Sequence, residues 1–207
     1  MARSAERASE TTRAEAQADR ARRFMKSALA ILGETGRTDF TVLEVVERSK
    51  TSLRSFYQHF STKDELLLAL IDKIMAESTQ RWRADTDGLA GPEALETLIE
   101  RITTPASSSI QDSINRGLTF YNDHLAESLP TEYARVLAPL HQLIGDILRR
   151  GINAGGFRSD VDVQTTATLV MQSVLGAMRL RSLGVELNGT PIDGAQISQF
   201  CLRGLTP

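Results

Sequence analysis

Apolar residues recur along most of the chain at the spacing of an α-helix, and polar residues fill the positions between them. The first clear stretch begins at Arg20, after which Phe24, Ala28, Ile31 and Leu32 share one helical face. A glycine-containing segment then ends this helix. The pattern therefore predicts an amphipathic helix that buries one face.

Two short helices and one long helix follow. Thr41 is a good N-cap with Glu44 three residues later, which predicts a capping box and a short helix whose valines face inward. A second short helix runs to about Gln58. The long helix starts at Ser61 or Thr62, with acidic residues in its first turn.

The rest of the chain carries the same periodicity between segments rich in Gly, Pro and Ser. It predicts five further helices, near 92–104, 107–126, 130–153, 161–183 and 193–204. The sequence contains neither a β-type alternation nor an internal repeat. We expect an all-α protein of about nine helices.

Composition and charge divide the chain into three parts. Residues 1–19 lack large apolar side chains and are expected to form a flexible arm that could be helical near its end. Residues 20–66 form the first predicted domain, and 67–207 form the second. Nine Lys or Arg stand against four acidic residues in 20–63, and twelve against eighteen in 64–207. A small basic unit on an acidic body is typical of a polyanion-binding head.

Other features of the composition exclude several classes of protein. A single cysteine, Cys201, excludes an intrachain disulfide and fits a reducing compartment. No apolar run reaches the roughly 18 residues of a membrane span. We therefore expect a cytoplasmic protein with no membrane partner.

The two short helices and their tight turn predict a helix-turn-helix. On a helical wheel Leu53, Phe56 and Phe60 share an inward face, and the polar residues share the opposite face. Whether Leu53 faces the core or the DNA stays open, and on the DNA side it would touch a thymine methyl group. Arg54 suits a bidentate contact with guanine, and Gln58 could pair with adenine. The residues expected to contact phosphates are Ser52, Ser55, Tyr57 and Lys63.

The stretch from Arg23 to Met75 resembles the DNA-binding region of the TetR family of transcriptional regulators. Three motifs carry the resemblance: Thr41 to Val45, "FYQHF" at 56–60, and "TKDEL" at 62–66. It implies three N-terminal helices, of which the second and third form the helix-turn-helix, followed by a helical effector-binding domain. The turn departs from the family pattern, because 49–52 reads "SKTS" where the family usually has "AGVS".

With the resemblance, the predicted functional residues fall into three groups. Those expected at the DNA are Thr41, Lys50, Thr51, Ser52, Arg54, Ser55, Tyr57, Gln58, His59 and Lys63. Those expected to line an effector cavity are Met75, Trp82, Phe120, Tyr121, His124, His141, Met171 and Met178. Those expected in a dimer seam on the last two helices are Leu169, Val170, Val174, Ala177, Ile197 and Leu202.

These predictions favour a homodimeric regulator, most simply a repressor, that binds a palindromic operator and is released by a small apolar or amphipathic effector. Activation instead of repression stays open. The alternatives are an all-α enzyme or binding protein with a vestigial head, and a structural adaptor. The sequence holds no catalytic constellation, and its three histidines lack metal-ligand spacing, so neither a metal nor a cofactor is expected.

Overall fold

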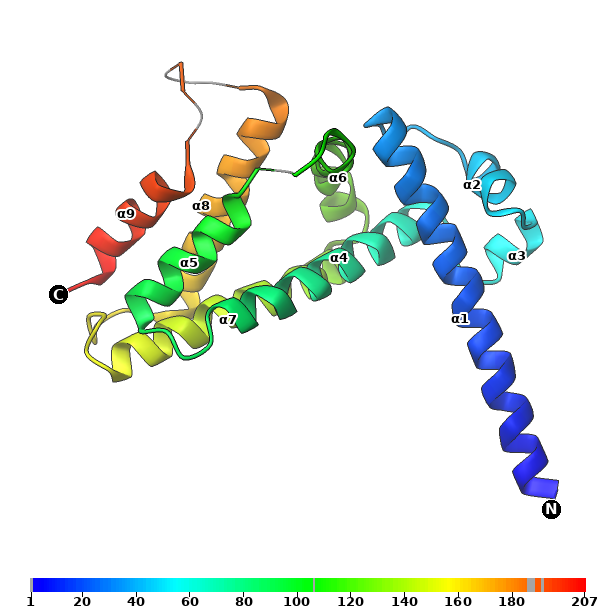
Figure 1. Cartoon of the computed structure of the whole chain (residues 1–207), viewed down its shortest axis with the longest axis horizontal. Coiled ribbons are helices and arrows are strands. Elements are labelled where there is room, and N and C mark those ends of the chain that lie inside the picture. The colour runs from blue at the N-terminus through cyan, green and yellow to red at the C-terminus, as the bar shows by residue number, and fades with distance from the viewer. Residues whose placement is uncertain (1, 106, 186–188, 191) are drawn as a thin grey trace. The chain divides into compact units, whose positions relative to one another are not determined.

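The computed structural model describes residues 2–105, 107–185, 189, 190 and 192–207, and these residues form nine α-helices with no strand (Figure 1). The helices are α1 (Ala2–Thr35), α2 (Val42–Ser49), α3 (Leu53–Tyr57), α4 (Lys63–Asp85), α5 (Gly91–Thr103), α6 (Ser109–Ser128), α7 (Pro130–Asn153), α8 (Val163–Leu183) and α9 (Gly194–Leu205). The all-α prediction is confirmed, and the later helices begin and end within two residues of their predicted bounds.

The start of α1 differs from the sequence-based expectation. Residues 2–19, expected as a flexible arm, form the first turns of α1 in the structure. Their composition explains this: the segment is rich in Ala, Arg, Glu and Gln, which favour helices, and it contains neither Gly nor Pro.

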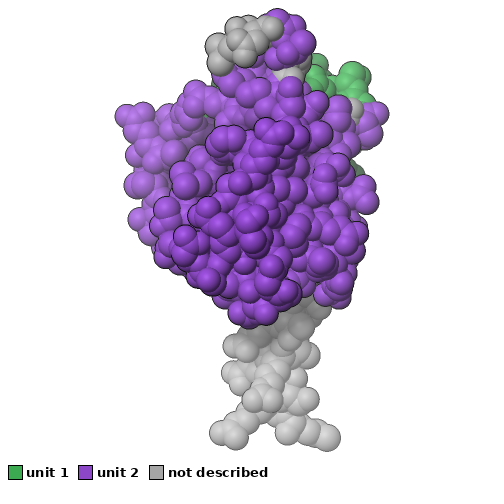
Figure 2. Space-filling view, turned by 90° about the vertical axis from the view of Figure 1, so that its left-hand side faces the viewer, with its two compact units in different colours: residues 1–71, 108–121 green, residues 72–107, 122–207 purple. Residues whose placement is uncertain are grey.

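The chain divides into two compact units (Figure 2). The first comprises Met1–Ile71 and Ser108–Tyr121, and the second comprises Asp72–Ser107 and Asn122–Pro207. The predicted boundary at residue 66 lies near the first division. The contribution of 108–121 to the first unit was not anticipated, because nothing in the sequence pattern shows which neighbour an amphipathic helix packs against.

The first unit is built on α1, against which α2 and α3 pack (Figure 1). Phe24, Ala28 and Leu32 of α1 are fully buried, as is Val45 of α2. The start of α6 also belongs to this unit because glycine permits close approach. A side chain at Gly117 would place its Cβ 2.9 Å from Leu32 Cδ2, too close for ordinary packing.

The second unit has a separate core between α5, α7, α8 and α9. Leu95, Leu98, Leu143 and Ile147 are buried within it, and each such side chain contributes about 1.5–3 kcal/mol through removal from water. Over the part of the chain that the structure describes, every helix is too short or too polar to cross a bilayer.

Candidate nucleic-acid interface

The first turn of α2 is held by the predicted capping box. The Thr41 hydroxyl donates to Glu44 Oε2 at 2.8 Å and accepts from the Glu44 amide at 3.2 Å, and the Thr41 amide donates to the same carboxylate at 2.6 Å. These bonds from Thr41 lower the pKa of Glu44 below its usual range. Thr41 therefore fixes the start of α2, and its hydroxyl is already engaged in the cap.

The turn between α2 and α3 forms without the glycine that is usual in the family. Lys50 takes its place in the left-handed region, at φ 53° and ψ 47°, which costs a non-glycine residue about 1–2 kcal/mol. Its amide donates to the Glu47 carbonyl at 3.1 Å, and the Thr51 amide donates to the Val46 carbonyl at 3.0 Å. Ser49 is buried and shares a 2.7 Å hydrogen bond with the Thr51 hydroxyl, which ties the turn together.

The short helix α3 begins at the Ser52 cap, whose hydroxyl accepts from the Ser55 amide at 3.2 Å. Arg54, Tyr57 and Gln58 are exposed along it, and Ser55 is half-buried. The helical wheel placed Leu53 on the inward face, and this is wrong because 43% of the residue is exposed. As the first residue of a five-residue helix it lies at the edge of the core, and the deeper site is filled by Phe56.

An aromatic cluster holds α3 on α1. The rings of Phe24 and Phe56 meet edge to face with centroids 5.4 Å apart, and Phe60 lies 6.4 Å from Phe24 in the same geometry. Such pairs contribute about 0.5–1.5 kcal/mol beyond their burial. The exposed polar residues of α3 are thus carried on a rigid support.

His59 is part of that support. Its ring lies 5.8 Å from that of Phe24, its Nδ1 is 2.7 Å from the Ser55 carbonyl oxygen, and its Nε2 is 3.0 Å from that of Gln17. These contacts favour a structural role for His59, which the sequence analysis placed among the residues expected at the DNA.

Lys63 also points inward, although the sequence suggested a phosphate contact. Its Nζ donates to the carbonyl oxygens of Thr38 at 2.9 Å and Phe40 at 3.2 Å. The ammonium lies 5.6 Å from the ring centroids of both Phe40 and Tyr121, within cation–π range. Lys63 is half-buried in this setting, and only the tertiary structure brings these groups together.

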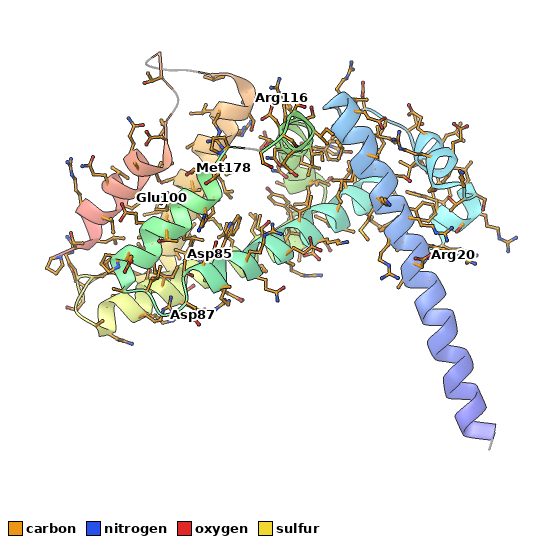
Figure 3. The ribbon with its side chains drawn as sticks, in the orientation of Figure 1. Arg20, Asp85, Asp87, Glu100, Arg116 and Met178 are labelled. Atoms are coloured by element: carbon orange, nitrogen blue, oxygen red, sulfur yellow. The ribbon has the colours of Figure 1, made fainter. Side chains whose placement is uncertain are left out.

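The residues predicted for an effector cavity divide between the two units. Met171 is buried in the core of the second unit, and Met75, Trp82 and Met178 pack against it; Met178 lies on α8 (Figure 3). Also in the second unit, His124 is exposed, and His141 is half-buried with its Nε2 3.0 Å from the Thr168 hydroxyl.

The other two predicted effector residues lie in the first unit. There Phe120 is 56% exposed, and Tyr121 donates to Asp64 Oδ1 at 2.6 Å. Burial and this bond to Asp64 raise the pKa of Tyr121 above its usual range.

The predicted dimer-seam residues are mostly turned inward. Four of them are buried in the core of their own unit: Val170, Val174, Ala177 and Ile197. Leu202 packs on that core, whereas Leu169 is 63% exposed. Phe200, which sequence analysis missed, is 75% exposed on α9 and lines with Leu169 a cleft of about 660 Å³ between α8 and α9. Its place three residues after the predicted seam residue Ile197 gave no usable signal.

A capped α2, a tight turn and a short α3 with exposed Arg, Tyr and Gln form a helix-turn-helix head. Residues 24–70 match the model of the bacterial regulatory proteins of the tetR family. Over 160 residues the chain is 24% identical to the HTH-type transcriptional repressor KstR2 of Rhodococcus jostii, spanning 73% of this chain and 74% of that protein.

Solved structures show the same fold. The fatty acid degradation regulator FadR of Bacillus halodurans matches with a TM-score of 0.69 at 16% identity, over 88% of this chain and 98% of that one. FadR of Bacillus subtilis, in complex with stearoyl-CoA, matches with a TM-score of 0.62 at 18% identity, over 87% and 95%. Residues 24–70 thus carry the N-terminal domain of the tetR family of bacterial regulatory proteins, and over most of its length the chain shares the fold of regulators of this kind.

Proposed function

We propose that this protein is a homodimeric, ligand-responsive repressor that binds a palindromic operator in the cytoplasm. The observation that carries the proposal is the exposed face of α3, where Arg54, Tyr57 and Gln58 stand on the buried Phe24–Phe56 support. Arginine and glutamine are the side chains that pair most directly with guanine and adenine edges in the major groove. The basic composition of residues 20–63 supplies the attraction to phosphates.

In this proposal the DNA contacts come from both sides of the turn. Lys50 and Ser52 are exposed beside α3 and face phosphates, and exposed Leu53 would meet a thymine methyl. The hydroxyl of Thr41, the ring of His59 and the ammonium of Lys63 already have bonds within the head. We assign these three to holding the head in shape.

Dimerisation and repression are the other parts of the proposal. One short helix contacts too few bases for tight binding, so two heads must act together on a two-fold site. The exposed Leu169 and Phe200 on α8 and α9 offer an apolar surface for a second copy. The name of the related KstR2, a repressor, supports repression over activation.

The second unit would hold the effector and the dimer surface. Met75, Trp82, Met171 and Met178 give its core the adaptable apolar side chains that suit an apolar or amphipathic ligand. The similar FadR of Bacillus subtilis binds stearoyl-CoA, a ligand of that class.

Selection of binding sites from random DNA tests the proposal. The full-length protein should enrich a two-fold symmetric sequence whose half-site centres lie about 34–36 Å apart, or a multiple of that. Affinity for the enriched site should fall steeply with salt, because phosphate contacts release counterions. Enrichment of no sequence, or of asymmetric sites alone, would contradict it.

A further inference from the structure

The loop that leads into α2 is held from the start of α4. Lys63, the first residue of α4, donates to the carbonyl oxygens of Thr38 and Phe40, at 2.9 and 3.2 Å. Thr41, the N-cap of α2, follows directly. A charged donor strengthens both bonds, so Lys63 fixes the chain immediately before the helix-turn-helix begins.

Tyr121, past the middle of α6, in turn holds Lys63. The ring of Tyr121 lies 5.6 Å from the Lys63 ammonium, and its hydroxyl donates to Asp64 at 2.6 Å. Tyr121 thus contacts the two adjacent residues that open α4. Lys63 lies at the same distance from the ring of Phe40, so the ammonium has aromatic rings from two segments around it.

The same portion of α6 packs tightly on the end of α1. Gly117 approaches so closely that an added Cβ would lie 2.9 Å from Leu32 Cδ2 and 3.1 Å from the Gly36 carbonyl oxygen. Gly36, at φ +65°, turns the chain from α1 into the loop. Gly117 of α6 therefore contacts the start of the loop. Tyr121 of α6 contacts Lys63, which in turn holds the end of the loop.

We propose that Tyr121 is a positioning residue for DNA binding: it holds Lys63 on the Thr38 and Phe40 carbonyl groups and thereby fixes where α2 begins. The proposal rests on the proposed function only in that DNA affinity is one of its two readouts. Loss of the Tyr121 ring frees the ammonium, loosens the loop and lets α2 and α3 depart from the geometry that the operator requires.

The first test needs no DNA. Hydrogen exchange of the full-length protein should show faster exchange of the amides of 38–46 in Tyr121→Leu, with exchange in α5 and α7 unchanged. Tyr121→Phe keeps the ring and should restore most of the protection. Phe120→Leu is the matched control, because it removes an exposed aromatic ring from the adjacent position of the same helix. Unchanged exchange at 38–46 in Tyr121→Leu would overturn the proposal.

The second test uses the operator enriched by selection. Tyr121→Leu and Lys63→Met should each weaken operator binding by roughly tenfold, the size of one hydrogen bond to a charged group. The double variant should be little worse than either single variant, because the two side chains act in series. Fully additive losses would overturn the proposal.

The salt dependence separates positioning from direct contact with DNA. A lost phosphate contact lowers the slope of log affinity against log salt by about one. We expect Lys63→Met to keep the wild-type slope, and a slope reduced by one would assign Lys63 to a phosphate instead. If the wild-type protein bound no DNA, the proposed function would fail while the exchange experiment still decided the role of Tyr121.

Discussion

Arg48 of α2 forms a two-point ion pair with Glu34 of α1. Its Nη1 donates to Glu34 Oε2 at 2.8 Å, and its Nη2 donates to Oε1. The bonds from Arg48 outweigh the opposing effect of burial and hold the pKa of Glu34 below its usual range. The pair ties the first helix of the helix-turn-helix to the helix that supports it.

This ion pair predicts a loss of stability in acid. A carboxylate whose pKa is depressed by folding contributes stability above its unfolded-state pKa and loses it as the pH falls through the folded-state pKa. The unfolding free energy should therefore stay constant near neutral pH and decrease as the pH falls below the usual range of carboxyl pKa values. Glu34→Gln should decline less steeply in urea titrations across that range. Glu47→Gln, at an exposed glutamate of α2, is the matched control variant.

Asp146, which lies in the second unit, should add to the same loss of unfolding free energy at low pH. Burial raises its pKa, but hydrogen bonds from Arg149 and Arg83 outweigh that effect and leave the pKa lowered. If the unfolding free energy did not change as the pH fell below the carboxyl range, neither ion pair would contribute to stability.

Arg54→Ala should relax the base preference at one position of the operator. The exposed arginine of α3 is expected to pair with a guanine, so its loss should cost about 1–3 kcal/mol at that position and little elsewhere. Selection from random DNA with the variant measures this directly. Arg37→Ala is the control, since Arg37 is an exposed arginine of the α1–α2 loop paired with Asp39. A variant Arg54→Ala that kept the full base preference would show that α3 presents a different face.

Phe200→Glu should weaken dimerisation. A large exposed aromatic residue at the centre of an apolar contact typically contributes about 2 kcal/mol or more, and a buried carboxylate adds a further penalty. Sedimentation velocity over a range of concentrations gives the dimer dissociation constant. Ile110→Ser, which removes an exposed apolar residue from the other unit, should leave it unchanged. A dimer equally stable in Phe200→Glu would place the interface elsewhere.

If the proposed function holds and stearoyl-CoA, the ligand in the similar FadR structure, acts as the effector, it should bind more weakly when operator DNA is present, and the operator more weakly when stearoyl-CoA is present. The coupling is reciprocal by thermodynamic necessity and is typically about 1–3 kcal/mol. Calorimetric titrations of the full-length protein measure the affinity for stearoyl-CoA with and without operator, and the affinity for operator with and without stearoyl-CoA. Equal affinity in the two titrations would exclude this ligand as the releasing effector. No heat in either would exclude it as a ligand.

Gly151→Ala should destabilise the second unit. The ring of Phe157, which is 2% exposed, lies directly against the α-carbon of Gly151, and an added methyl group would overlap it. Overpacking of this kind costs about 1–3 kcal/mol. Gly145→Ala on the same helix meets nothing closer than 3.7 Å and should be neutral or stabilise by up to about 1 kcal/mol. Thermal and urea unfolding of both variants checks the pair, and equal stability would contradict the packing argument.

The secondary-structure elements of this protein could be predicted from its sequence, because the signals for them are local. Capping residues such as Thr41 and Ser52 act on amides three positions away, so the starts of α2 and α3 follow from neighbouring residues. The helix-turn-helix could be recognised for the same reason, since its turn spans only a few residues. Even the missing glycine is accommodated locally, by Lys50 in a left-handed conformation.

Which face of each helix meets which neighbour depends on how the helices pack in three dimensions and could not be predicted from the sequence. α8 carries apolar residues around much of its circumference, so its periodicity could not separate Val170, which is buried, from Leu169, which is exposed. Lys63 lies at the start of a helix, where a phosphate contact was the natural expectation, yet its nearest acceptors are carbonyl groups more than 20 residues earlier. Contacts over such separations depend on how helices pack, and helical spacing does not encode them.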